Sequence, residues 1–135
     1  MMFQQIYPLM KPAFSHNIVN VSSTLGLRPT ADTSAYSATK AAMVNWTHSL
    51  ALGLGAQNIR ANCVCPGLVD TPIHPFHDQP AERKQITLQK MAHMQPLGRI
   101  GTPEEIAKAI YFLACEDSSW TTGSVLSVDG GINFA

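Results

Sequence analysis

The chain contains three short runs of residues that are expected to form parallel strands, and these runs constrain the fold most strongly. The first spans residues 17–22 and is mostly continuous rather than alternating, as expected for a strand covered on both faces. The others span residues 58–65 and 124–128. Parallel strands need crossover connections of a dozen or more residues, and the intervening segments are long enough to provide them. We therefore expect an α/β fold with a parallel sheet.

The segment between the first two runs predicts one long helix, from about Ser34 to Leu54. Asp32, Thr33 or Ser34 can cap its start, and glycines stand at its end. Its first half is rich in alanine, and the sequence leaves two explanations open for this. The alanines either reflect helix propensity alone or permit the close approach of a cofactor, the sheet or a partner helix.

Further helices are predicted on either side of this unit. Thr102, Pro103 and Glu105 occupy the N-cap, N1 and N3 positions of a capping box, and an apolar stripe follows up to about Cys115. Another helix is expected over about residues 80–94. Residues 1–11 have roughly helical apolar spacing and are interpreted as the last turns of a helix without a start.

Two polar side chains at the start of the long helix are candidates for proton chemistry. Tyr36 and Lys40 lie four residues apart, so a helix puts them on one face. An ammonium a few Å from a phenol stabilises the phenolate, which suits a group that exchanges a proton near neutral pH. Ser23 ends the first strand, where its hydroxyl could polarise a carbonyl beside the phenol. On spacing alone, a solvated helix face and a simple turn explain these residues better.

The order of these features, however, resembles the short-chain dehydrogenase/reductase family. The matching segments are Asn20-Val21-Ser22-Ser23, residues 36–42, residues 62–72 around Pro66-Gly67, and residues 122–131. They span roughly residues 17–131. The resemblance implies an oxidoreductase that uses NAD or NADP and transfers a hydride between the nicotinamide and a small-molecule carbonyl or alcohol substrate.

The resemblance also implies a Ser-Tyr-Lys catalytic centre. Tyr36 would be the acid in reduction and the base in oxidation. Lys40 would stabilise the phenolate and bind the nicotinamide ribose, and Ser23 would hold the substrate oxygen.

The family pattern assigns cofactor contacts to Tyr36 and Lys40 and to four residues after the second strand. These four are Pro66, Gly67, Val69 and Thr71. Pro66-Gly67 would wall the nicotinamide, the Val69 backbone would meet its carboxamide, and the Thr71 hydroxyl would reach the phosphates. Without the resemblance, Pro66-Gly67 is an ordinary turn.

The Gly-rich phosphate-binding segment that comes earlier in the family does not occur in these 135 residues, since the chain holds no G-x-G-x-x-G. The sequence therefore looks like the C-terminal half of a Rossmann-like doubly wound sheet, with the N-terminal dinucleotide half missing. We expect residues 1–135 to form one partial domain in which residues 72–101 cover the substrate. We also expect an uncovered edge at the first strand, which invites self-association.

An alternative function also fits the sequence. In the family, the last helix and strand form a subunit interface, which suggests a homo-oligomer. A catalytically inactive fragment that only packs into such oligomers, through the surface of residues 102–128, is therefore the second hypothesis.

Composition excludes several other classes of protein. Nine basic and nine acidic residues give no net charge and no basic patch, which argues against binding nucleic acid or an anionic membrane. The three cysteines are expected to be free thiols of a cytoplasmic protein, and we expect Cys63 and Cys65 to point to opposite faces of their strand. The spacing of His74 and His77 resembles a metal motif, but the intervening proline breaks a helical presentation, so no metal is expected.

Overall fold

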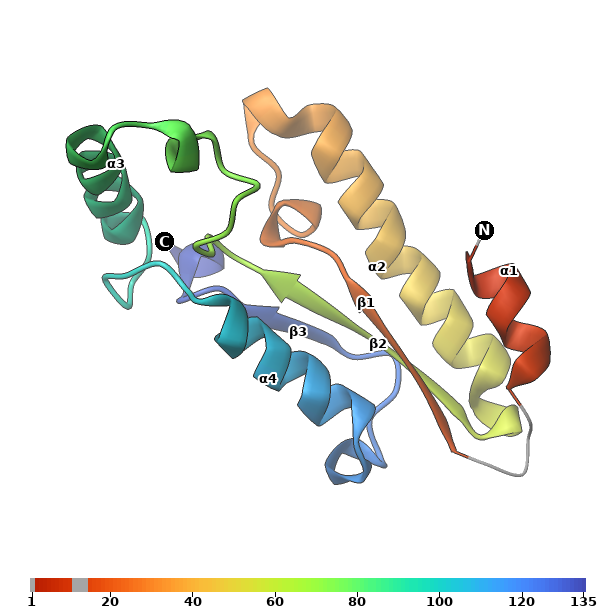
Figure 1. Cartoon of the computed structure of the whole chain (residues 1–135). Coiled ribbons are helices and arrows are strands. Elements are labelled where there is room, and N and C mark those ends of the chain that lie inside the picture. The colour runs from red at the N-terminus through yellow and green to blue at the C-terminus, as the bar shows by residue number, and fades with distance from the viewer. Residues whose placement is uncertain (1, 11–14) are drawn as a thin grey trace.

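The computed structural model describes residues 2–10 and 15–135, and its centre is a three-stranded parallel sheet. The strands are β1 (His16–Val21), β2 (Ile59–Pro66) and β3 (Val125–Val128), in the order β1-β2-β3. Helix α2 (Ser34–Leu54) covers one face of the sheet and α4 (Pro103–Ala114) covers the other (Figure 1). The predicted α/β class and its parallel sheet are thereby confirmed.

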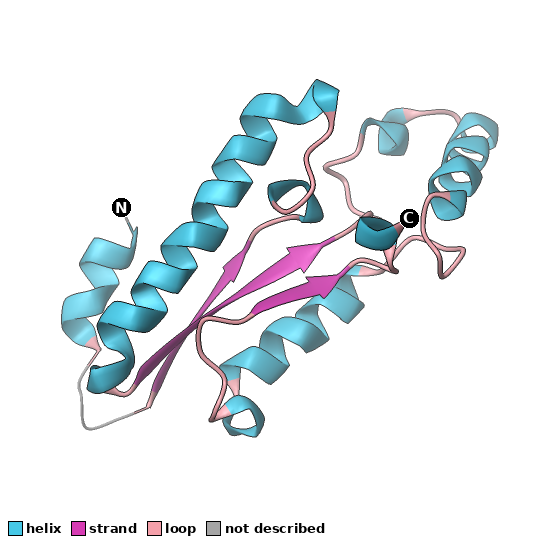
Figure 2. Cartoon of the chain, turned by 180° about the vertical axis from the view of Figure 1, so that it is seen from behind, coloured by secondary structure: helices cyan, strands magenta, loops and turns pink. Residues whose placement is uncertain are grey.

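Two smaller helices complete the described part of the chain. Helix α1 (Met2–Ile6) lies beside α2 on the same side of the sheet, and the ring of Phe3 meets Trp46 edge to face at 5.6 Å between centroids. Helix α3 (Ala81–His93) stands away from the sheet, as the view from behind also shows (Figure 2).

The core lies between β2 and α2. Strand β2 is the central strand, and seven of its eight residues are buried because both of its neighbours and both helical layers cover it. Ile59 and Ala61 pack against Leu50 and Leu54 of α2. Burying a side chain of the size of leucine or isoleucine contributes about 1.5–3 kcal/mol, so this contact fixes α2 on the sheet.

Polar side chains of β2 fix the loop that leads into β3. The amide of Asn62 is almost fully buried, donates to the carbonyl of Thr121 and accepts from the N–H of Ser124, each at 2.9 Å. The guanidinium of Arg60 donates to the carbonyls of Thr121 and Cys115. Every buried polar group in this set has a partner, which a buried group needs to avoid a desolvation cost.

Element bounds follow the sequence closely. Helix α2 spans the predicted residues, and each strand lies within one residue of its predicted ends. The capping box of α4 is present, with the Thr102 N–H donating to the Glu105 carboxylate at 2.9 Å. The prediction of a helical start to the chain is confirmed for α1, and residues 1 and 11 lie outside the described residues.

The prediction that Cys63 and Cys65 point to opposite faces was wrong, because residues two apart on a strand share a face. Both thiols are fully buried and hydrogen-bonded to each other. That hydrogen bond and burial raise the pKa of Cys65, while the same hydrogen bond lowers the pKa of Cys63 to about 7. Cys63, Cys65 and Cys115 are all free thiols, as predicted.

Candidate active site

The candidate site lies where the carboxyl ends of β1 and β2 meet the start of α2. In open parallel sheets this end of the strands is the usual place for a ligand. Ser22, the first residue after β1, joins the two elements: its N–H donates to the Val64 carbonyl and its hydroxyl donates to the Lys40 carbonyl, both at 2.8 Å. The sequence gives Ser22 no role beyond its place in the segment that resembles the family, so these two hydrogen bonds were not predicted.

Tyr36 and Lys40 share one face of α2, as predicted. The Lys40 ammonium lies 5.6 Å from the centroid of the Tyr36 ring, within the range of a cation–π contact. The same ammonium donates to the Val21 carbonyl at the end of β1, at 3.1 Å. The Tyr36 side chain is 44% exposed, so its phenol is open to a ligand.

Ser23 lies on the loop that follows β1, at the same end of the sheet. Its backbone is extended, with φ −165°, and its hydroxyl oxygen accepts from the N–H of Leu25 at 3.2 Å. Because the oxygen is the acceptor in that bond, the hydroxyl proton is left to donate to another oxygen.

The loop after Ser23 packs tightly on α2 beside Lys40. A Cβ atom on Gly26 would lie 2.8 Å from the Lys40 carbonyl carbon and 3.0 Å from the Ala41 nitrogen. Only glycine permits this approach, because the opposing atoms belong to the backbone of a helix. The loop that carries Ser23 is therefore held in place against the turn of helix that carries Lys40.

Pro66 and Gly67 form the end of β2, next to β3. The Gly67 N–H donates to the Val128 carbonyl at 3.0 Å. A Cβ atom on Gly67 would lie 2.7 Å from the Cα of Asp129, so a side chain does not fit here. On sequence alone, Pro66-Gly67 is an ordinary turn. In the structure, its second residue must be glycine because Asp129 packs directly against it.

Val69 and Thr71 follow on the segment that leaves β2. Val69 is buried and pairs with Gly101 in an isolated parallel bridge, in which the bonding groups on this segment belong to Leu68 and Asp70. The N–H and C=O groups of Val69 itself therefore point away from the bridge. Thr71 is half-buried.

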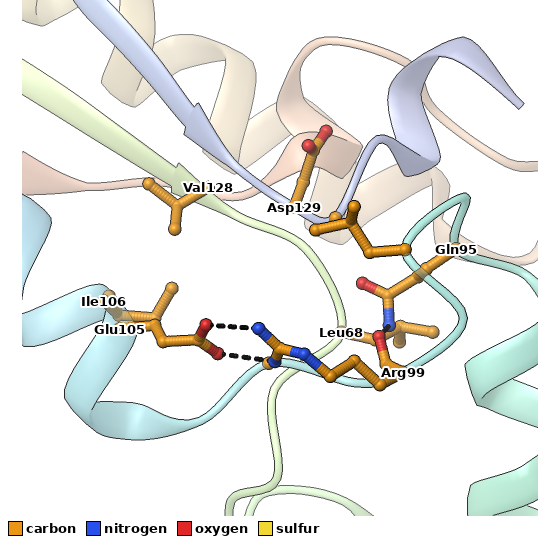
Figure 3. Close-up of a pocket in the computed structure, with 10 residues that line it drawn as sticks. Leu68, Gln95, Arg99, Glu105, Ile106, Val128 and Asp129 are labelled. Carbon is orange, nitrogen blue, oxygen red and sulfur yellow. Dashed lines mark hydrogen bonds and ion pairs between the residues drawn. The ribbon is translucent and has the colours of Figure 1, made fainter.

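A cavity of about 100 Å³ lies behind this turn, between the end of β3 and the start of α4 (Figure 3). Arg99 and Glu105 close one side of it through two hydrogen bonds of 2.9 and 2.6 Å. The hydrogen bonds from Arg99 lower the pKa of Glu105 to about 2. Small-molecule sites usually have volumes of roughly 300–1,000 Å³. This cavity is smaller, so we interpret it as a packing gap between the end of β3 and the start of α4 rather than as a substrate pocket.

Residues 72–101 contain the short helix Pro75–Asp78, helix α3 and the chain that returns to α4. Phe76 is buried, but Met94 is 57% exposed. Met91 is half-buried. These three residues line neither the cavity in Figure 3 nor a second hollow at the other end of the sheet, which lies between the start of β2 and Trp120. Among the described residues, no group of three His, Cys, Asp or Glu side chains is placed to hold a metal ion. No described helix is long and apolar enough to cross a membrane.

Comparison with known proteins agrees with this arrangement. The family model described as enoyl-(acyl carrier protein) reductase matches residues 1–133. A 3-oxoacyl-[acyl-carrier-protein] reductase of Chlamydia trachomatis is 42% identical over 127 residues, which cover 94% of this chain and 48% of that protein. Cis-4-hydroxycyclohexanecarboxylate dehydrogenase of Sinomonas cyclohexanicum is 46% identical over 122 residues, covering 90% of this chain and 47% of that one.

A solved structure has the same architecture. Ligand-free aldohexose dehydrogenase of Thermoplasma acidophilum superposes with a TM-score of 0.90 at 33% identity, covering 98% of this chain and 54% of the other. The chain belongs to the short-chain dehydrogenase/reductase family, a family of oxidoreductases. It spans about half the length of the relatives it matches.

Proposed function

We propose that this chain supplies the catalytic half of an NAD(P)-dependent oxidoreductase that interconverts a carbonyl and an alcohol. The contact that carries the proposal is the Lys40 ammonium, which is fixed at the Val21 carbonyl and lies 5.6 Å from the centre of the Tyr36 ring. The ammonium and the tyrosine ring thus share one site at the carboxyl ends of the strands, where the Tyr36 hydroxyl can exchange a proton with a substrate oxygen.

The residues divide the work of the reaction as follows. In reduction, the Tyr36 hydroxyl gives its proton to the oxygen of the substrate carbonyl, and in oxidation the phenolate takes the proton of the alcohol. The Ser23 hydroxyl, whose oxygen already accepts from Leu25, donates to the same substrate oxygen and so orients the carbonyl. Proton transfer of this kind contributes about 10²–10⁴ in rate, and holding the reactants in register contributes more.

A nicotinamide, when bound, would supply or accept the hydride. The groups that fit it in this chain are the side-chain-free surface of Gly67 and the outward N–H and C=O of Val69, beside Pro66. Thr71 is placed further along the same segment, where its hydroxyl would meet the phosphates. We propose that Lys40 also binds the nicotinamide ribose.

The substrate side is proposed to be residues 72–101, which would cover the bound carbonyl compound. The relatives include a 3-oxoacyl-[acyl-carrier-protein] reductase and an aldohexose dehydrogenase, whose names give different substrates for oxidoreductases of one family. We therefore place specificity in this segment and the chemistry in α2 and the strand ends.

The test is a single polypeptide in which the part of the Chlamydia reductase that this chain does not match is joined to residues 1–135. Tyr36→Phe in this protein is expected to lower turnover with NADH or NADPH by about 10² or more. Tyr111→Phe, at a 72% exposed tyrosine on α4, is the matched control and should leave turnover unchanged. Full turnover in the Tyr36→Phe variant would contradict the assignment of proton transfer to Tyr36. No turnover in the joined protein itself would make the inactive oligomer-packing fragment the better account.

A further inference from the structure

The C-terminal segment, residues 129–135, lies at the same end of the sheet as the candidate site and contacts two of its parts (Figures 1 and 2). A Cβ atom on Gly67 would lie 2.7 Å from the Cα of Asp129, so the turn proposed to wall the nicotinamide packs directly on this segment. The Leu97 N–H donates to the Gly130 carbonyl at 3.1 Å. The end of the segment proposed to cover the substrate is therefore attached to the same residues.

Hydrogen bonds to the Asp129 carboxylate fix the shape of the C-terminal segment. Its two oxygens accept from the N–H groups of Gly131 and Asn133, at 2.9 and 3.3 Å. Hydrogen bonds to a charged acceptor are stronger than those between neutral groups. The φ angle of Gly131 is 89°, in the left-handed region that favours glycine, and the Phe134 N–H donates to the Gly131 carbonyl at 2.9 Å. The segment is thus a turn with a defined backbone.

Arg28 attaches a third part of the site, the loop that carries Ser23. Its Nη1 donates to the carbonyls of Asn133 and Ala135, at 2.9 and 2.8 Å. The same loop packs on α2 at Gly26, close to Arg28 in the chain. The loop is therefore held at two places, by α2 and by the C-terminal segment.

We propose that the C-terminal segment fixes the relative positions of these three parts of the site, and that Arg28 is the positioning residue for the loop that carries Ser23. Under the proposed function, on which this inference rests, Ser23 orients the substrate oxygen and Gly67 borders the nicotinamide. Their separation therefore decides how closely the substrate carbon approaches the hydride. A displacement of about 1 Å can cost about 10² in rate, even when its cause lies away from the reacting atoms.

The first experiment uses the joined protein that tests the proposed function and follows the reduction of ethyl 3-oxobutanoate, a neutral ester. Arg28→Met is expected to lower kcat at least about tenfold and to leave the KM of NADH or NADPH unchanged, because the proposed cofactor contacts lie on other segments. Arg28→Lys keeps a cation that can donate to one carbonyl and should recover part of kcat. Lys108→Met removes an exposed cation from α4 and is the matched control, which should change neither constant.

A second substrate separates positioning from direct binding, because Arg28 is exposed and carries a positive charge. The anion 3-oxobutanoate is assayed beside its neutral ester. If Arg28→Met raises only the KM of the anion and leaves kcat for the ester unchanged, the guanidinium binds substrate and the inference is overturned. An unchanged kcat for both substrates, in a protein that Tyr36→Phe inactivates, would also overturn it while the proposed function stands.

The attachment itself is measured in residues 1–135 without any substrate, by amide hydrogen exchange. Arg28→Met is expected to speed exchange at Gly131 and Asn133 at least about threefold and to leave the amide of Cys63 in β2 unchanged. Unchanged exchange at Gly131 and Asn133 would show that Arg28 does not hold the segment and would overturn the inference. If the wild-type joined protein shows no turnover, the proposed function fails, and this exchange measurement alone decides whether Arg28 fixes the loop to the C-terminal segment.

Discussion

Helices α2 and α3 are both proposed to serve the candidate site, but they differ in how much of each is packed against the rest of the molecule. Helix α2 buries Ser37, Thr47, Leu50 and Leu54, whereas no residue of α3 is buried. Figure 1 shows the same contrast, with α2 lying along the sheet and α3 standing off from it. The residues proposed for proton transfer thus lie on a packed platform, and the residues proposed to cover the substrate lie on a segment with little packing of its own.

Under the proposed function, this difference would separate the residues that carry out the reaction from those that select the substrate. The α3 segment is anchored at its two ends, by the buried side chains of Phe76 and Gln95 and by the Arg99–Glu105 pair just before α4. A segment with few buried contacts opens at low free-energy cost, so it can adjust to different substrates while α2 stays fixed. The predictions below test this contrast, from the largest expected effect to the smallest.

Truncating one apolar side chain on each helix should give very different losses. Leu50→Ala on α2 removes a core side chain and is expected to lower the free energy of unfolding by about 3 kcal/mol. Ile86→Ala on α3, where the side chain is 48% exposed, should cost less than about 1 kcal/mol. Urea unfolding measures both, and similar losses would show that α3 is packed as firmly as α2.

A substitution at Gly26 tests whether the loop that carries Ser23 is packed closely against α2. Gly26→Ala places a Cβ atom against the Lys40 backbone and should destabilise the chain by about 1–3 kcal/mol. Gly53→Ala is the matched control, because a Cβ atom there meets nothing within 4 Å and the change should stabilise α2 by up to about 1 kcal/mol. If Gly26→Ala were also neutral or stabilising in thermal unfolding, the loop would not be held as described.

Breaking the Arg99–Glu105 ion pair should have a small effect on stability, and this effect should depend on pH. The pKa of Glu105 is lowered to about 2 from an ordinary value of 4.5, so its carboxylate stabilises the folded chain above pH 4.5 and loses that effect as the pH falls toward 2. Glu105→Gln should therefore lower the melting temperature slightly at pH 6 and not at pH 2. Glu104→Gln, in the same helical turn, should keep the wild-type pH dependence, and an identical profile for both variants would contradict the role of the pair.

The sequence predicted the main strands and helices and the shared face of Tyr36 and Lys40, because these features depend on local patterns of residues. A mostly continuous apolar run predicted β1, and the pattern of Thr102, Pro103 and Glu105 predicted the start of α4. The four-residue spacing correctly predicted that Tyr36 and Lys40 share a helical face.

The parts that could not be predicted depend on contacts between distant segments. The tie from Ser22 to Lys40, the close approach at Gly26 and the pairing of Arg99 with Glu105 have no signature in spacing alone. The placement of the two β2 cysteines was wrong for a different reason: the side-chain period of a strand is two, and it was misapplied. The roles of Ser23, Tyr36, Lys40 and the residues after β2 stay predictions.

The most direct test of the whole account is a fluorescence titration of residues 1–135 with NADH and with NADPH, first alone and then with the unmatched part of a relative. If this chain supplies the proton-transfer residues and lacks the dinucleotide site, the chain alone should show weak or no binding, and the partner should restore it. Micromolar binding of either cofactor to residues 1–135 alone would contradict the division of the site on which the proposed function rests.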